Sequence, residues 1–462
     1  MTRKAKNDVL YKDLVKAIAK ANEQNALALT QDKSVEGIMK IVEQFIAEKQ
    51  LVCYGGTAIN NILPKAKRFY DSKLELPDYD FFSPNALDDA IALADIYQAA
   101  GYSEVEAKAG VHFGTYKVFV NFIPVADITQ LPPELFETLR KEALVRKKIR
   151  YAPPEYLQMA MYLELSRPKG DVSRWEKVLH RLSLLNESYP IKGRRCGNVK
   201  FSRKFDGSKQ EKNLIIKTVK DGVIDNEGVF FGAYAVQKFN LNLPKDERKE
   251  IDIEPDFDVL SLNPLDLATK LRDDLIAAGF DAEVEMLPGY GEIIATHYEV
   301  RVNDESVAFV YEPLACHNYN IYHSNNQKIR VATVDTMLSL YLAFLYSDRS
   351  YHDKDRIYCM CKYIFSIQMR TDVDYKGLMK RFTLDCIGHQ KDLGEMRAEK
   401  SEMFAALKSK RGSKEYDEWF LRYIPGEKEK RKTKVSAKTT KKKTKTKVSA
   451  KTTKNKTQKM SK

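Results

Sequence analysis

The chain repeats part of its own sequence, and this repeat limits the folds that it can adopt. Residues 77–102 align without a gap on residues 255–280, with 13 identities in 26 positions. Two further blocks keep the same order: 54–58 with 231–235, and 118–128 with 300–310. Because chance rarely yields three matching blocks in one order, we expect one supersecondary unit to occur twice.

Hydrophobic spacing and turn residues predict the elements of the first copy. The expected helices are 9–22, 35–49, a short one from Thr57 to Pro64, 86–100, 155–165 and 175–185, and the expected strands are 51–54, 76–82, 114–121 and 122–129. Asn303-Asp304 is a tight-turn signal in the second copy, which supports a hairpin turn at Asn121-Phe122 in the first. The unit therefore mixes helices with a sheet and indicates an α/β fold.

The length of 462 residues allows about three domains. After the second copy the pattern is mostly helical from 333 to 423, with apolar helical stretches at 336–347, 357–368, 376–388 and 402–410. We therefore predict a helical C-terminal region after the repeats.

The basic charge lies almost entirely in the last 36 residues. Residues 427–462 hold 16 of the 77 Lys and Arg and two of the 64 Asp and Glu, so the tail carries +14 and the rest −1. The block KVSAKTTK occurs there twice, and so few apolar residues predict a disordered tail. Such a tail attracts polyanions without reading sequence, and nucleic-acid tethering is favoured over a solubilising or nuclear-localisation role.

Other features exclude several classes of protein. No apolar run approaches about 18 residues and the N-terminus has no apolar core of a secretory signal, so we expect neither a membrane span nor secretion. The six Cys include no CxxC pair, which favours a reducing compartment and unligated thiols. The seven scattered His do not predict a structural zinc site.

Two carboxylates in the first copy have the spacing of a metal site. Asp78 and Asp80 flank Tyr79 on an expected strand, so both side chains point to one face. Hard carboxylate oxygens suit Mg²⁺. Three other D-x-D triplets, at 256/258, 353/355 and 372/374, make the spacing alone a weak signal.

The neighbouring glycines and a third carboxylate strengthen this prediction. Gly55-Gly56 opens a short helix, where backbone N–H groups can approach a phosphate, and Thr57 adds a hydroxyl, although a purely structural turn also explains the pair. Asp127 lies in an apolar run and is costly to bury unless it is paired or metal-bound. If its strand neighbours that of Asp78 and Asp80, three carboxylates converge and could bridge two Mg²⁺ or Mn²⁺ ions.

These motifs resemble the nucleotidyltransferase superfamily with a polymerase-β-type palm. The blocks YGGTAINNILP, LPDYDFF, FVNFIPVADIT and YLELSRPKGDVSRWEKVLHRL resemble the poly(A) polymerase catalytic subunits of poxviruses and giant DNA viruses. The resemblance is strong over residues 35–190. It implies the following division: 1–34 an N-terminal helical segment, 35–190 a catalytic domain, 191–330 a degenerate nucleotidyltransferase-like domain, 331–426 the helical region and 427–462 the tail.

The resemblance also implies an activity and its requirements. These are transfer of AMP from ATP to an RNA 3′ end by Asp78, Asp80 and Asp127 with two Mg²⁺ or Mn²⁺ ions, with Gly55, Gly56 and Thr57 at the phosphates. It implies a homodimer, or else a separate processivity partner, and a place in the virion and the host-cell cytoplasm.

Basic residues in the SRPKGDVSRWEKV block are further candidates for the triphosphate. Arg174 and Lys177 are three positions apart and share a helix face, so they lead the set of Arg167, Lys169, Ser173, Arg174 and Lys177. Lys117, beside the expected hairpin, is a weaker candidate. For any single one of them, solvated helix-end charge is the favoured explanation.

The second copy is expected to be inactive. It keeps Asp256 and Asp258, but Ala233, Tyr234 and Phe309 replace Gly56, Thr57 and Asp127. We therefore expect a degenerate domain used for RNA contact, rigidity or self-association.

Two other functions remain open from the sequence. One is another nucleotidyltransferase, of the CCA-adding, uridylyl-adding or oligoadenylate-synthesising kind. The other is a non-catalytic RNA-binding scaffold.

Overall fold

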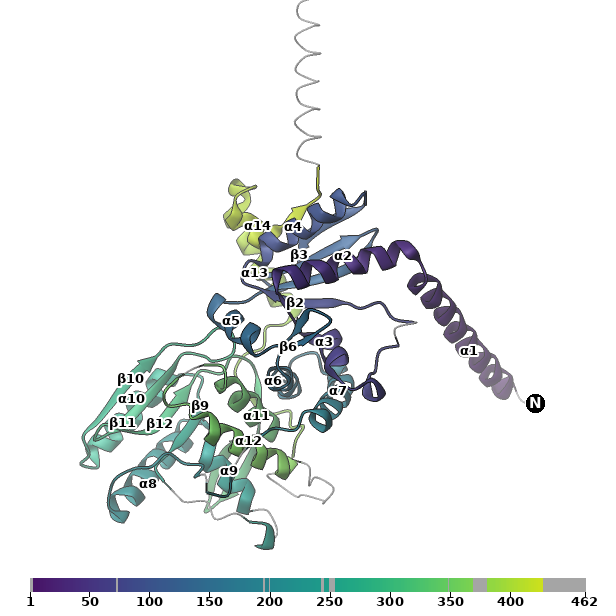
Figure 1. Cartoon of the computed structure of the whole chain (residues 1–462). Helices are drawn as coiled ribbons and strands as arrows, with labels where there is room; N and C mark the ends of the chain where they lie inside the picture. The colour runs from purple at the N-terminus through teal and green to yellow at the C-terminus, as the bar shows by residue number, and fades with distance from the viewer. Residues whose placement is uncertain are drawn as a thin grey trace, which may run out of the picture.

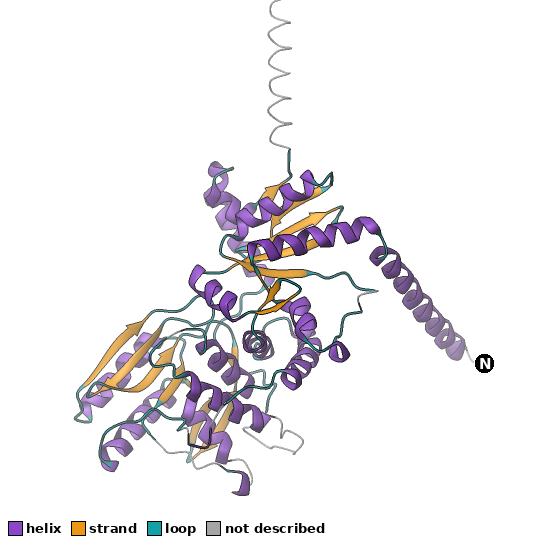
Figure 2. Cartoon of the chain, in the orientation of Figure 1, coloured by secondary structure: helices purple, strands orange, loops and turns teal. Residues whose placement is uncertain are grey.

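The structure, a computed structural model, describes residues 3–71, 74–193, 196–198, 200–241, 245–248, 254–347, 349–368 and 380–426. The expected disorder of 427–462 concerns residues outside these ranges. Within them, the chain forms two eight-stranded sheets with helices around each (Figures 1 and 2). The helices are α1 Arg3–Thr30, α2 Lys33–Lys49, α3 Gly55–Ile62, α4 Ala86–Ala99, α5 Pro133–Glu142, α6 Pro154–Leu165, α7 Trp175–Ser188, α8 Lys209–Asp225, α9 Gly232–Leu241, α10 Pro264–Ala277, α11 Val334–Phe344, α12 Lys354–Gln368, α13 Leu393–Leu407 and α14 Lys414–Phe420.

The two sheets share the order of seven of their eight strands. Sheet one contains β1 Val52–Cys53, β2 Tyr79–Ser83, β3 Val105–Ala109, β4 Thr115–Val120, β5 Ile123–Gln130, β6 Leu144–Arg146, β7 Ile149–Tyr151 and β16 Arg422–Tyr423, in the order β16-β3-β4-β5-β2-β1-β7-β6. Sheet two contains β8 Val229–Phe231, β9 Phe257–Leu260, β10 Ala282–Leu287, β11 His297–Val302, β12 Glu305–Tyr311, β13 His317–Ser324, β14 Gln327–Ala332 and β15 Cys386–Ile387, in the order β10-β11-β12-β9-β8-β14-β13-β15. Seven strands of each sheet therefore correspond one to one, and the expected tandem α/β fold is confirmed.

Local geometry repeats as closely as the strand order. Asn121 and Phe122 have φ of 49° and 65°, and Asn303 and Asp304 have φ of 49° and 68°, so both hairpins close with two left-handed residues. Each hairpin also has a register shift at the matching place, Val118/Phe119 in β4 and Val300/Arg301 in β11. The hairpin expected at Asn121-Phe122 is therefore present.

One face of sheet one is closed and the other is open. In β4 the side chains of Tyr116, Val118 and Val120 are buried, whereas those of Thr115, Lys117 and Phe119 alternate with them and stay partly exposed. Helix α4 packs on β3, β4 and β5, and the hydroxyl of Tyr97 in α4 donates to the carbonyl of Ile38 in α2. The period of two thus leaves one face of the sheet available for a site.

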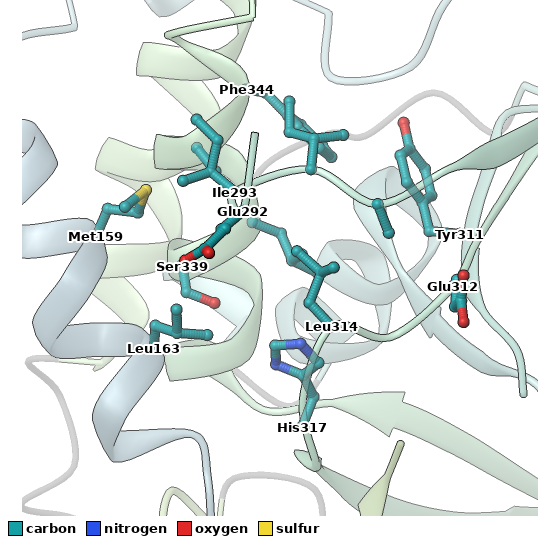
Figure 3. Close-up of a pocket in the computed structure, with 14 residues that line it drawn as sticks. Met159, Leu163, Glu292, Ile293, Tyr311, Glu312, Leu314, His317, Ser339 and Phe344 are labelled. Carbon is teal, nitrogen blue, oxygen red and sulfur yellow. The ribbon is translucent and has the colours of Figure 1, made fainter. Parts of the chain in front are cut away.

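Equivalent helices of the two repeats pack against each other. Helix α6 follows β7 and packs on α11, which follows β14. Between them lies a cavity of about 30 Å³, lined by Met159 and Leu163 of α6, Ser339 and Phe344 of α11, and His317 (Figure 3). This space suits about one water molecule, and it is too small for a nucleotide.

Helix α1 is not packed against either sheet. It extends away from the body of the molecule (Figure 1), and the side chains of Tyr11, Leu14, Val15 and Ile18 are exposed. The C-terminal helices α13 and α14 lie instead at the β3 edge of sheet one, where β16 adds a strand. No helix among the described residues is both long and apolar enough to cross a bilayer.

Two expectations from the sequence are wrong. Residues 376–388 were expected to be helical, but their described part, 380–388, contains no helix and includes β15, which pairs with β13. Free thiols were expected throughout, but Cys196 is bonded to Cys359 and Cys316 to Cys386, each with a Cα–Cα distance of 5.3 Å. The fold brings together partners that lie 163 and 70 residues apart. The remaining two, Cys53 and Cys361, are free and buried.

Candidate active site

The acidic residues of the first repeat lie on neighbouring strands. Strands β2 and β5 are parallel neighbours, and Asp80 is the register partner of Asp127. Asp78 directly precedes β2 and is exposed, whereas the Asp127 side chain is only 18% exposed. The strand of Asp127 therefore neighbours the strand of Asp78 and Asp80, as the convergence predicted from the sequence requires.

Lys117 changes the expected picture of three converging carboxylates. Lys117 is the register partner of Asp127 on β4, and its ammonium group forms an ion pair with the Asp127 carboxylate. Within the described residues, no group of three or more His, Cys, Asp or Glu side chains is arranged to hold a metal ion. Asp127 therefore pairs with Lys117 in this structure, and the binding of metal ions by the three carboxylates stays a prediction.

The site is nevertheless short of positive charge. Burial, followed by the charges of Asp78 and Asp127, raises the pKa of Asp80 to about 7, against the opposing charges of Lys117 and Arg174. Partial desolvation by its neighbours, followed by the charge of Asp127, also raises the pKa of Asp78, and Lys117 opposes this shift. Ionised carboxylates that repel one another in a partly buried site favour a bound cation, so this donor set fits hard divalent ions.

Helix α3 begins against the Asp80 carboxylate. Gly55 has φ of +72°, and a Cβ at this position would overlap the Asp80 carboxylate. The helix starts at Gly55 and not at the expected Thr57, and its N-cap, Tyr54, makes no side-chain capping bond. The backbone N–H groups of the first turn are thus presented beside Asp80 without a side-chain cap.

Thr57 has a different role from the expected one. Its hydroxyl donates to the carbonyl oxygen of Asp78 at 2.7 Å, and its side chain is buried. The hydroxyl proton is already used in this bond and does not suit a phosphate. Thr57 instead fastens the start of α3 to the residue that precedes β2.

Arg174, Lys177 and Arg181 lie on one face of the Arg174–Ser188 segment, but they have different environments. Arg174 forms an ion pair with Glu164 at 3.1 Å, and Lys177 is exposed. Arg181, which the sequence analysis missed, donates to the Tyr70 hydroxyl at 2.8 Å. Its Nη1 lies 2.9 Å from the position of a Cβ built on Gly56. Arg181 lies seven positions after Arg174, which places both on one helix face, and this spacing could have indicated it from the sequence.

A cleft of about 1080 Å³ adjoins the start of α3. Thr57 and Tyr79 line it, and Asn60 and Asn61 continue the α3 wall. Its acidic lining residues are Glu43, Glu48 and Glu75, and Asp78, Asp80 and Asp127 do not line it. Basic side chains from three other elements also line it: Lys40, Arg68, Arg146, Lys147 and Lys148. These residues were not predicted from the sequence, since the β6–β7 hairpin that carries the last three was not predicted.

The second repeat copies this geometry only in part. Gly232 has φ of +82°, and a Cβ there would overlap the Asp258 carboxylate, as at Gly55 and Asp80. Asp258 has Phe309 as its register partner, in the place of Asp127. Asp256 and Asp258 are 2% and 3% exposed, so these carboxylates are not open to substrate.

Known proteins share both the sequence of the first repeat and the overall fold. Residues 40–171 match the family model of the poly(A) polymerase catalytic subunit. This segment contains Asp78, Asp80, Asp127 and the glycine turn, so the site described above lies within the part of the chain that carries the family resemblance.

Individual relatives agree with this match. A protein of African swine fever virus (isolate Tick/Malawi/Lil 20-1/1983) is 35% identical over 181 residues, 38% of this chain and 36% of its own length. A protein of Acanthamoeba polyphaga mimivirus is 32% identical over 158 residues, 33% of this chain and 26% of its own. Both are named "Putative poly(A) polymerase catalytic subunit". The matched segment thus spans about a third or less of these relatives' length.

The fold extends further than the sequence identity. The crystal structure of the Megavirus polyadenylate synthase matches with a TM-score of 0.75 and 19% identity, over 92% of this chain and 87% of that chain. The two-sheet architecture of this chain is therefore that of a known viral fold.

Proposed function

We propose that the protein is a template-independent poly(A) polymerase, which adds AMP from ATP to the 3′ end of RNA. The observation that carries this proposal is that Asp80 and Asp127 are register partners on neighbouring strands, beside the α3 N-terminus. Both lie inside the segment that matches the catalytic-subunit family. The acidic pair and the uncapped helix start together suit a nucleoside triphosphate and a cation.

The roles of the residues follow from their positions. Asp78, Asp80 and Asp127 would hold two Mg²⁺ or Mn²⁺ ions, which neutralise phosphate charge during the transfer when bound. The first-turn N–H groups of α3, with Arg181 beside Gly56, hold the triphosphate. Asp127 orients the RNA 3′-hydroxyl and takes its proton as the 3′-oxygen bonds to the α-phosphorus and pyrophosphate leaves.

The test of this function is incubation with labelled RNA, Mg²⁺ and one nucleoside triphosphate at a time. Long tails with ATP alone are the expected result. U-tails, a short CCA end, or 2′–5′ oligomers made without RNA would each replace the proposal by another nucleotidyltransferase. RNA binding with no incorporation would indicate a scaffold.

We expect Arg181→Ala to weaken the use of ATP. The guanidinium lies against the helix start that we assign to the phosphates, so its loss should lower kcat/KM for ATP by about 10- to 100-fold, mainly through KM. Lys141→Ala is the control, since Lys141 is an exposed basic residue of α5 with no assigned role, and it should change kcat/KM less than about threefold. Equal effects of the two changes would remove the special role of Arg181.

We propose that the +14 tail tethers RNA. Deleting 427–462 should leave single-nucleotide addition on saturating primer nearly unchanged, weaken RNA binding, and flatten the slope of log K against log salt, because fewer counterions are released. The measurement is RNA binding by fluorescence anisotropy at several salt concentrations. An unchanged slope would show that the tail does not contact RNA.

We propose that the chain forms a homodimer, and that it works in the virion and the host-cell cytoplasm. Two subunits around one RNA strand would favour rebinding after each addition and lengthen tails without a helper. Light scattering of the full chain should give about twice 53.1 kDa, alongside long tails in competitor RNA. A monomeric mass with short tails would instead favour a separate processivity partner.

A further inference from the structure

Both carboxylates of the second repeat are paired with one arginine, which comes from the linker between the repeats. Arg203 lies between α7 and α8, and its Nη1 forms an ion pair with Asp256. Its Nη2 lies 3.3 Å from Asp258, and its backbone N–H donates to Asp256 at 2.7 Å. The guanidinium thus spans the pair of carboxylates that corresponds to Asp78 and Asp80.

The third position of this site has changed to suit the arginine. The guanidinium carbon lies 4.4 Å from the centre of the Phe309 ring, and Phe309 stands where the first repeat has Asp127. An aromatic ring cannot ligate a divalent ion, but its face attracts a guanidinium. Phe309, in the place of Asp127, therefore suits a site that holds the Arg203 guanidinium.

The charges in this buried site are balanced. Asp256 and Asp258 are almost completely buried, and the side chain of Arg203 is 17% exposed. Arg356 of α12 adds a second guanidinium, with Nη1 3.6 Å from Asp256. Two anions and two cations meet, which is the arrangement in which buried charges are tolerated.

The same arginine fixes the course of the linker. Two neighbouring linker groups are held as well. The carbonyl of Phe201 accepts from Arg356 of α12 at 3.1 Å, and the N–H of Asp206 donates to Glu305 of β12 at 2.7 Å. In the first repeat the corresponding segment before α2 is α1, which extends away from the body (Figure 1). The segment before the first helix of each repeat thus closes one site and leaves the other open.

We propose that Arg203 is the resident cation of the second repeat: its guanidinium takes the place of divalent ions at Asp256 and Asp258, closes this site to metal and nucleotide, and fastens the linker between the repeats. The carboxylates of the second repeat then hold the linker in place and take no part in catalysis. This inference does not depend on which nucleotide the first repeat uses.

Mn²⁺ binding, followed by electron paramagnetic resonance of the full chain, tests the clamp directly. The background is Asp80→Asn with Asp127→Asn, which removes ligands of the first site. Adding Arg203→Ala should create a new Mn²⁺ site of about one ion per chain, and adding Asp258→Asn to that variant should remove it. A folded Arg203→Ala variant that gains no Mn²⁺ would overturn the proposal.

A second arm covers the case in which Arg203→Ala does not fold. Arg203→Met combined with Asp258→Asn removes one cation and one anion, and leaves Asp256 beside Arg356, so the charges of the site stay balanced. Recovery of a folded protein in this double variant would support the clamp, because Asp258 no longer needs a cation. Failure of the double variant to recover folding would show that Arg203 does not act by compensating these charges, and would overturn the proposal.

Discussion

Replacement of Asp80 or Asp127 by Asn will lower the rate of nucleotide addition by about a thousandfold or more, with the fold intact. The two residues are register partners on β2 and β5, and we assign both to the cations of the transfer. Loss of one carboxylate charge from such a site removes several kcal/mol of transition-state stabilisation, about 4 kcal/mol for a thousandfold effect. Initial rates at saturating ATP and RNA, with thermal melting of each variant, provide the measurement. Asp78→Asn should cause a loss of the same kind.

The control for these variants is Glu106→Gln. Glu106 lies on β3, on the same open face of sheet one, two strands from Asp127, so the change removes a carboxylate charge without touching the acidic pair. Its rate should stay within about threefold of the wild type. A rate in Asp80→Asn equal to that of Glu106→Gln would refute the catalytic assignment.

The repeat could be predicted from sequence because its first half kept its residues. The 77–102 block and its copy share identities at the start of β2 and β9 and along α4 and α10, so alignment alone placed these elements. The rest of the shared strand order was not predicted. Strands β6 and β7 have three residues each, too few to display a period of two. The short match of KIRYA at 148–152 with KIRVA at 328–332 was the remaining signal for the pair β7 and β14.

The site was predictable where it depended on strand alternation and not where it depended on long-range contacts. Asp78, Asp80 and Asp127 followed from spacing and burial cost, whereas the pairing of Lys117 with Asp127 depends on the exact register of β4 and β5. Arg203 was missed for a related reason. The linker has no periodic pattern, and its one important side chain is defined by contacts 53 and 55 residues away.

The glycines at the two helix starts give a pair of variants with opposite outcomes. Gly55→Ala must place a side chain at φ of +72° against the Asp80 carboxylate. The left-handed backbone costs roughly 1–2 kcal/mol, and displacement of a catalytic carboxylate by about 1 Å costs about a hundredfold in rate. We therefore expect a loss of about a hundredfold or more in kcat with only a modest fall in melting temperature.

Gly232→Ala meets the same backbone strain at φ of +82° and the same overlap, but with Asp258, which Arg203 holds. Asp258 takes part in a buried ion pair, and we assign it no part in the reaction, so the cost should fall on folding and lower the melting temperature. At a temperature where the variant is folded, kcat should stay within about threefold of the wild type. Rates and melting curves of both variants side by side separate the two roles. A Gly55→Ala enzyme with full activity would mean that Asp80 does not need its present position, and equal losses of kcat in both variants would mean that the two repeats share the chemistry after all.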